Sequence, residues 1–220
     1  MTTSKTVGLT ADIQQYLIDH SIERGDVHER LVAATLEAQP DWAIMQIPHE
    51  QGAFLTWLVR LVGAKSAIEV GTFTGYSALC IAQGLPDDGQ LICCDVSDEY
   101  TSVGRPFWEE AGVADRIDLR IAPAAETLAA LPDEEFLDLA FIDADKESQL
   151  GYYEEILRRL RPGGVIVIDN TLLFGSVTEP DRDDEAVVAV RKQNDFIAAD
   201  DRVETVMVNI ADGLALIRKR

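Results

Sequence analysis

The sequence has no long hydrophobic run, few basic residues and few cysteines. No apolar stretch among its 220 residues reaches membrane-spanning length, and residues 1–5 do not lead into a signal-peptide core. We therefore expect a cytoplasmic protein without membrane contact. Lysine and arginine total 19 against 39 aspartate and glutamate residues, a formal net charge of −20. A field of that sign repels polyanions, so nucleic acid is a disfavoured partner.

The three cysteines, Cys80, Cys93 and Cys94, lie inside apolar runs and lack the spacing of a metal site. This pattern indicates buried, reduced thiols. Hydrophobic residues make up 47% of the chain, as is ordinary for a folded globular protein. At this length we expect a single domain over residues 1–220, with residues 1–45 as an N-terminal helical extension.

The stretch from Ala67 to Ser77 joins a short apolar run to a helix through a glycine turn. Gly71 and Gly75 let the backbone turn sharply and approach a ligand closely. Their Gly-x-x-x-Gly spacing differs from that of dinucleotide sites, and Glu69 would repel a pyrophosphate. S-adenosylmethionine fits better, because its ammonium and sulfonium suit the carboxylate of Glu69. Its own carboxylate can accept hydrogen bonds from the helix N-terminus and from Ser77.

Apolar runs alternate with helical patterns along the rest of the chain. Two helices are expected within residues 10–38, the first capped by Thr10, followed by an extended connection over residues 45–48. A helix over residues 50–61 should bury Phe54, Leu55, Leu58 and Leu61. Later helices are expected at 101–111, after Pro123 and at 185–197, and strands at 67–70, 90–94, 117–121, 137–142, 164–168, 203–209 and 214–218. The alternation predicts an α/β fold with a parallel sheet covered on both faces, and the final hairpin adds an antiparallel strand.

Acidic residues end several of these strands, where ligands of such folds bind. Asp95 follows its strand about 24 residues after Gly71, a position at which a carboxylate accepts hydrogen bonds from a ribose diol. Asp143 ends one later strand, and Asp169 with Asn170 ends the next. If those strands are neighbours, roughly 4.8 Å apart, three oxygen donors can converge on one ion. Such ligands select Mg²⁺ first, with Mn²⁺ or Ca²⁺ as alternatives.

Three motifs in one chain, Glu-x-Gly-x-x-x-Gly-Tyr-Ser, Asp-Ala-Asp-Lys and Asp-Asn-Thr-Leu, carry a family resemblance. From about Lys5 to the C-terminus the chain resembles the cation-dependent class I O-methyltransferases, the caffeoyl-CoA and catechol group with its bacterial relatives. The resemblance implies a Rossmann-like class I methyltransferase fold with a seven-stranded, mostly parallel sheet, an antiparallel last strand and helices on both faces. It also implies bound S-adenosylmethionine, a divalent cation and a homodimer.

The resemblance further assigns roles to individual residues. At the methyl donor it places Ile47, Glu69, Gly71, Thr72, Ser77, Asp95, Ala124 and Asp145. It makes Asp143, Asp169 and Asn170 the metal ligands, so Asp143 is also counted as catalytic. Lys146 matches the lysine that is thought to take the hydroxyl proton in catechol-type members, and Lys5 matches a substrate-contacting lysine. Leu173 and Phe174 stand where the family often has tryptophan and a polar residue, so the acceptor pocket is individual.

These features together predict methylation of one hydroxyl of a catechol-like or other vicinal-diol aromatic small molecule. Two alternatives share the donor and the fold, namely a hydroxylated tRNA uridine and a caffeoyl-CoA-type thioester. Both acceptors are polyanionic, and the net charge of −20 disfavours them. A binding or regulatory protein that keeps the donor without catalysis is a third possibility, against which the intact metal-ligand motif argues.

Overall fold

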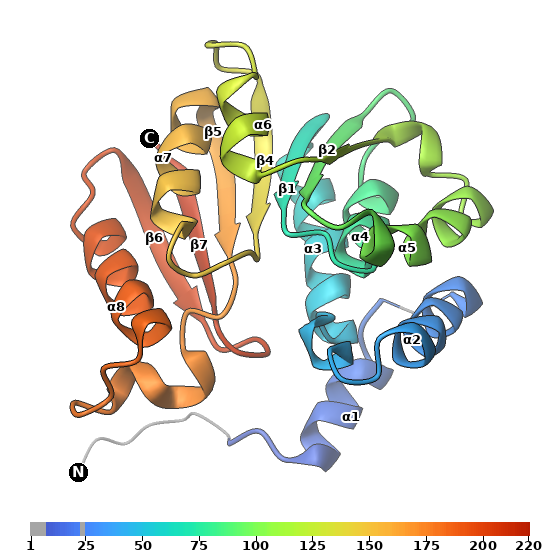
Figure 1. Ribbon diagram of the computed structural model, residues 1–220, viewed down its shortest axis with the longest axis horizontal. Helices are drawn as coiled ribbons and strands as arrows, with labels where there is room; N and C mark the ends of the chain where they lie inside the picture. The colour runs from blue at the N-terminus through green and yellow to red at the C-terminus, as the bar shows by residue number, and fades with distance from the viewer. Residues whose placement is uncertain (1–7, 23–24) are drawn as a thin grey trace.

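The computed structural model describes residues 8–22 and 25–220. These residues form one seven-stranded sheet with helices packed around it (Figure 1). Its strands lie in the order β3-β2-β1-β4-β5-β7-β6. Their bounds are Ser66–Val70 for β1, Gln90–Asp95 for β2, Ile117–Ile121 for β3, Leu137–Ile142 for β4, Leu160–Ile168 for β5, Val203–Val208 for β6 and Leu214–Lys219 for β7. The pairs from β3 to β5 are parallel, whereas β7 is antiparallel to β5 and β6. The predicted fold class is confirmed.

Helices cover both faces of this sheet, with α3, α4 and α5 on one side and α6, α7 and α8 on the other (Figure 1). The bounds are Ala11–Asp19 for α1, Asp26–Ala38 for α2, His49–Val62 for α3, Tyr76–Gly84 for α4, Asp98–Glu110 for α5, Ala124–Ala129 for α6, Gln149–Arg159 for α7 and Glu185–Ala198 for α8. Short 3₁₀ helices occur at Ala43–Met45, Ala114–Arg116 and Leu173–Thr178. This arrangement puts the loops after the parallel strands at one edge of the sheet.

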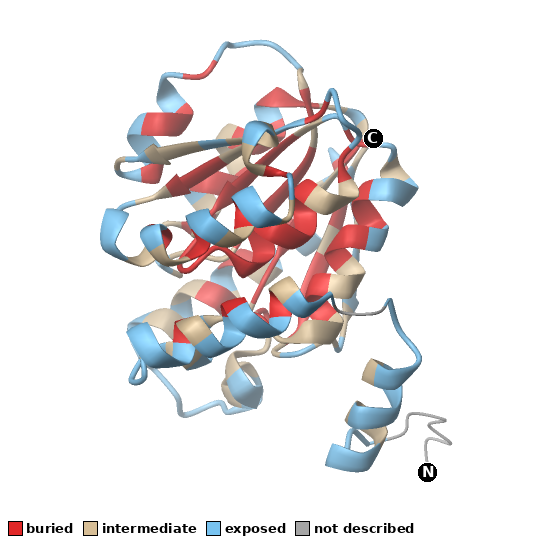
Figure 2. Ribbon diagram, turned by 90° about the vertical axis from the view of Figure 1, so that its right-hand side faces the viewer, coloured by how far each residue is buried: buried red, intermediate tan, exposed pale blue. Residues whose placement is uncertain are grey.

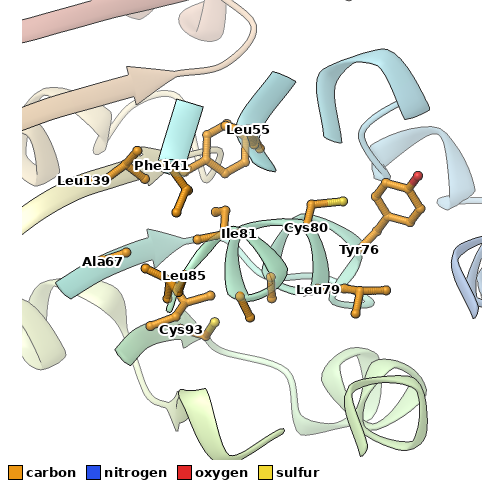
Figure 3. Close-up of a cluster of buried hydrophobic side chains, with 14 of the residues drawn as sticks. Leu55, Ala67, Tyr76, Leu79, Cys80, Ile81, Leu85, Cys93, Leu139 and Phe141 are labelled. Carbon is orange, nitrogen blue, oxygen red and sulfur yellow. The ribbon is translucent and has the colours of Figure 1, made fainter. Parts of the chain in front are cut away.

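The hydrophobic core lies on both faces because side chains alternate along each strand. In β1, Ala67 joins the cluster beneath α3, α4 and α5, whereas Ile68 and Val70 join the cluster beneath α6 and α7. Helix α4 is apolar on most sides and fills the first cluster, where Figure 3 shows its Ile81 near Phe141 of β4. Two dry cores therefore hold the central strands in fixed register.

The cysteine prediction is confirmed: Cys80, Cys93 and Cys94 are free and buried. Burial also raises the pKa of each thiol. These thiols therefore behave as small apolar core groups. None of the helices in the described ranges combines the length and apolar character needed to cross a bilayer.

The N-terminal helices lie at the end of the molecule toward which β4 and β5 run (Figure 1). Thr10 caps α1 as predicted, since its hydroxyl accepts a hydrogen bond from the Ile13 N–H at 3.3 Å. No residue of α1 is buried, and Figure 2 shows it standing away from the core. Lys5 lies outside the described residues. The division of the chain stays a prediction: one domain over residues 1–220, with residues 1–45 as its N-terminal helical extension.

Three local predictions need correction. The extended connection begins at Gln46, because residues 43–45 form a 3₁₀ turn. Helix α5 starts three residues before Thr101, since Ser97 accepts a hydrogen bond from the Tyr100 N–H and caps it. The third correction concerns Leu61 of α3, which is 63% exposed although the helical spacing placed it in the core. It lies about a third of a turn around the helix axis from the fully buried Leu55.

The contrast on α3 gives a matched pair of substitutions. Leu55→Ala should lower the free energy of unfolding by about 2–5 kcal/mol, because it opens a cavity beneath the sheet. Leu61→Ala should change it by less than about 0.5 kcal/mol, because Leu61 is exposed. Urea denaturation of both variants measures the difference. Equal losses from the two substitutions would show that the buried side of α3 is assigned wrongly.

Candidate active site

A cavity of about 930 Å³ opens at the carboxyl ends of β1, β2, β4 and β5. All of the site residues predicted from the sequence line it except Glu69, which lies behind its wall, and Lys5, which is not described. The predicted residues in the lining are Ile47, Gly71, Thr72, Ser77, Asp95, Ala124, Asp143, Asp145, Lys146, Asp169 and Asn170. The structure therefore brings residues from six separate stretches of sequence to one cavity.

The glycine loop after β1 packs directly against the loop after β4. Gly71 has φ +91°, and a Cβ there would collide with the backbone oxygen of Asp143. Only glycine fits this approach without strain. Gly75 has φ +84°, and a side chain there would meet the indole ring of Trp108, whose Nε1–H donates to the Gly75 oxygen at 2.9 Å. The loop is thus fixed on both sides before α4 begins.

Asp95 has a structural task that the sequence did not indicate. One carboxylate oxygen accepts hydrogen bonds from the backbone N–H groups of Thr72 at 2.9 Å and Phe73 at 2.8 Å. The other accepts from the Ser97 N–H at 2.8 Å. Because each carboxylate oxygen has two lone pairs, the first oxygen is fully engaged, whereas the second keeps one site that can accept a further hydrogen bond. Asp95 therefore holds the glycine loop in shape and also lines the cavity.

Glu69 is the most unusual group near the site. Its side chain is fully buried, and neither carboxylate oxygen has a hydrogen-bond partner of normal geometry among the described residues. Burial raises its pKa to about 7, although the nearby hydroxyls of Ser77 and Thr72 oppose this effect. A cationic group in the adjoining cavity would stabilise the ionised form of this carboxylate.

Asp143 and Asp169 follow neighbouring strands whose last residues, Ile142 and Ile168, are in register. The Asp169 carboxylate is held at both oxygens: one accepts from the Asn170 N–H at 2.6 Å, and the other from the Gln51 Nε2–H at 2.6 Å. Burial raises the pKa of both aspartates, and the charge of Asp143 raises that of Asp169 further. Two buried like charges favour a cation between them.

Lys146 supplies a positive charge at this point. Its Nζ donates to Asp143 Oδ1 at 3.2 Å and to Asn170 Oδ1 at 2.5 Å. Asn170 has φ +54°, and its Nδ2–H donates to Asp212 at 3.3 Å, so its Oδ1 faces the lysine. Oxygens of two of the three predicted metal ligands thus meet on one cationic group. The described part of the chain holds no cluster of three Asp, Glu, His or Cys side chains suited to a metal.

Three other residues at the site were not identified from the sequence. Tyr152 donates its hydroxyl to Asp145 at 2.9 Å, Asp212 supports Asn170, and Gln51 holds Asp169. Gln51 alone had a recognisable signal, since it is a polar residue one helical turn before Leu55 on the apolar side of the predicted helix. The role of Asp212 depends on a contact with Asn170 across 42 positions of the chain, and that of Tyr152 on its contact with Asp145, seven positions before it.

The outer rim of the cavity is apolar and conformationally unusual. Leu173 and Phe174 both have positive φ, 44° and 51°, which costs about 1–3 kcal/mol for each non-glycine residue. The Phe174 N–H donates to Asp212 at 2.5 Å, which helps hold this turn. Phe174 as a whole residue is 82% exposed. It forms a solvent-facing aromatic edge where the sequence departs from the family pattern.

A sheet of this order, with a glycine loop after β1 and a cavity beside it, defines the class of Rossmann-like methyltransferases. The family model described as O-methyltransferase matches residues 18–220, and the chain belongs to this family. The chain is therefore an enzyme that transfers a methyl group to oxygen, and the family resemblance drawn from the three motifs is confirmed.

Individual relatives cover nearly the whole chain. "Probable caffeoyl-CoA O-methyltransferase 1" of Dictyostelium discoideum is 42% identical over 94% of this chain and 91% of its own length. The flavonoid 3',5'-methyltransferase of Vitis vinifera is 38% identical over 96% of this chain and 94% of its own. The structure of the O-methyltransferase TomG from Streptomyces achromogenes, in complex with SAM, has a TM-score of 0.84 at 29% identity, covering 94% of this chain and 96% of that one.

The buried carboxylate of Glu69 predicts a specific pH dependence of stability. Its folded-state pKa of about 7 lies above its ordinary value of 4.5, so the unfolded chain loses this proton first as pH rises. The group therefore destabilises the ligand-free protein increasingly between pH 4.5 and 7, by up to about 3 kcal/mol at pH 8. Glu69→Gln removes this contribution, so the variant should gain stability relative to the parent protein between pH 5 and pH 8.

Urea denaturation of both proteins at pH 5, 6, 7 and 8, without ligand, measures this difference. Any constant effect of the new amide is present at every pH and cancels from the comparison. A difference in unfolding free energy that stays the same across this range would contradict the raised pKa.

Proposed function

We propose that this enzyme transfers a methyl group from S-adenosylmethionine to one hydroxyl of a vicinal-diol aromatic small molecule, with the help of a divalent cation. One observation carries the proposal. The glycine loop after β1 and the acidic strand ends of β4 and β5 form a single cavity and touch at Gly71 and Asp143. Donor and acceptor sites in direct contact are what a direct transfer between two bound molecules requires.

The donor side is assigned to the residues around the glycine loop. S-adenosylmethionine supplies the activated methyl group. The N-terminus of α4 with Ser77 suits its carboxylate, and Asp95 suits its ribose diol. Glu69, buried behind this wall without a hydrogen-bond partner in the described residues, suits its cationic methionyl end. The complex of TomG with SAM supports this assignment by similarity of fold and sequence.

The cation is assigned to Asp143, Asp169 and Asn170. The fit rests on two observations. Burial raises the pKa of both Asp143 and Asp169, and the charge of Asp143 raises that of Asp169 further. Oxygens of Asp143 and Asn170 already meet on the ammonium of Lys146. Two carboxylates and an amide oxygen form a hard donor set, which suits Mg²⁺ first and Mn²⁺ or Ca²⁺ next. When bound there, such a cation supplies positive charge that stabilises an ionised hydroxyl of the acceptor.

Lys146 is the predicted base for the acceptor hydroxyl. In the arrangement seen here its ammonium donates to two oxygens, so it first provides positive charge at the place where the acceptor oxygen would lie. To accept the hydroxyl proton it must first release one of its own. The loop after β1 at Gly71 and the loop after β4 at Asp143 keep the donor and acceptor sides at a fixed separation, because the backbones of these two loops are in contact.

The charge of the cavity wall favours an acceptor without phosphate groups. Among the described lining residues Lys146 is the one lysine or arginine, against the acidic residues Asp95, Asp143, Asp145, Glu147, Asp169 and Asp212. The apolar rim formed by Leu173 and Phe174 suits an aromatic ring. A neutral catechol or flavonoid-like acceptor satisfies both conditions, and the name of the Vitis vinifera relative is consistent with it.

A caffeoyl-CoA-type thioester is the second candidate, since the Dictyostelium discoideum relative carries that name. Its phosphates would meet a wall that is mainly acidic, so it ranks behind a neutral acceptor. A hydroxylated tRNA uridine meets the same objection. The homodimer and the cytoplasmic location stay predictions.

A methyl-transfer assay with labelled donor tests the function. The acceptor panel comprises simple catechols, flavonoids, caffeoyl-CoA and tRNA, each with Mg²⁺ and with excess chelator. We expect transfer to the neutral catechols or flavonoids, and at least a hundred-fold loss with chelator because the hydroxyl then lacks its stabilising charge. Asp169→Ala should show the same loss with Mg²⁺ present while donor affinity stays within about two-fold.

Each outcome bears on a separate part of the proposal. Transfer that chelator leaves unchanged would remove the cation from the mechanism. Labelled caffeoyl-CoA or tRNA without labelled catechol would replace the proposed acceptor class. Asp181→Ala, at an exposed acidic position outside the cavity lining, is the matched control for loss of one carboxylate.

A further inference from the structure

Gln51 is a fully buried polar side chain in the first turn of α3, and it lines the cavity. Its Nε2–H donates to Asp169 at 2.6 Å, a contact between residues 118 positions apart in the chain. Its other amide atom, Oε1, is buried and has no hydrogen-bond partner among the described residues. A buried acceptor without a partner destabilises the folded protein, so packing alone does not explain a glutamine at this position.

The orientation of this amide follows from the carboxylate beside it. Turning the amide over would place Oε1 against an Asp169 oxygen, so that two acceptors would face each other. The Asn170 N–H already holds the other Asp169 oxygen. With both oxygens engaged, the carboxylate cannot rotate without losing a hydrogen bond in a site that is 3% exposed. Gln51 and the backbone therefore set the plane of the Asp169 carboxylate.

We propose that Gln51 is a positioning residue of the cation site: it fixes the Asp169 carboxylate in the orientation in which that group can share a divalent ion with Asp143 and Asn170. The inference rests on the proposed function, because the cation itself is part of that proposal. Hydrogen bonds from outside the ligand set typically strengthen metal binding about 10- to 100-fold. Glu50, the neighbour of Gln51 in the first turn of α3, accepts a hydrogen bond from Gln14 of α1 at 2.8 Å, so α1 contacts the same turn.

The test measures binding of Mn²⁺ by calorimetry to metal-free protein. Gln51→Met keeps the length and volume of the side chain but removes the donor, so we expect Mn²⁺ affinity to fall about 10- to 100-fold. Affinity for S-adenosylmethionine, measured in chelator, should stay within about two-fold. Saturating Mn²⁺ should bring kcat back near the parent value, because Gln51 acts through Asp169 and not on the acceptor.

Two further variants keep the test decisive. Gln51→Asn retains the amide but is one methylene shorter, so it should also lose Mn²⁺ affinity, and it serves if the methionine variant does not fold. Gln193→Met is the matched control: this glutamine is 1% exposed, both of its amide atoms lack partners in the described residues, and it does not line the cavity. It should leave Mn²⁺ affinity unchanged.

The outcomes separate this inference from the proposed function. Unchanged Mn²⁺ affinity in both Gln51 variants would overturn the positioning role while leaving the cation site itself intact. An equal fall in Mn²⁺ and donor affinity would also overturn it, since that result indicates a general packing role. If the parent protein binds no Mn²⁺, the cation of the proposed function and the role of Gln51 fail together.

Discussion

The burial of two carboxylates side by side is the constraint on which the site depends. Because β4 and β5 are parallel neighbours in register, Asp143 and Asp169 leave the sheet at the same level. Burial raises the pKa of Asp169, and the charge of Asp143 beside it raises that pKa further. Such a pair persists only where positive charge or hydrogen-bond donors compensate it. Lys146, Gln51 and the Asn170 backbone supply that compensation here.

A second constraint ties this pair to the donor side. The Gly71 backbone runs so close to the Asp143 oxygen that no side chain fits between them. Asp95 holds the following two N–H groups, and Trp108 holds the end of the loop at Gly75. The loop that would cradle the methyl donor is thus built against the strand end that would hold the cation. The sheet, and not a flexible segment, therefore fixes the position of the donor side relative to the cation side.

Much of this could be predicted from the sequence, because apolar runs and glycine spacing are local signals. They located the strands, the loop and the acidic strand ends that meet at one cavity. Contacts between segments distant in the sequence could not be predicted from local patterns. Gln51 meets Asp169 across 118 positions, and Lys146 donates to Asn170 across 24. Helix spacing alone placed Leu61 in the core, although Leu61 is 63% exposed in the folded chain. The dual role of Asp95 was hidden because loop geometry creates it.

Anomalous diffraction from crystals soaked with Mn²⁺ and S-adenosylmethionine would locate the cation directly. We expect one manganese peak within coordination distance of oxygens from Asp143, Asp169 and Asn170, about 2.0–2.6 Å for a hard cation with oxygen ligands. We also expect that the ammonium of Lys146 no longer lies between Asp143 and Asn170. A manganese peak elsewhere, with Lys146 still bound to both oxygens at full donor occupancy, would show that Asp143, Asp169 and Asn170 do not form the cation site.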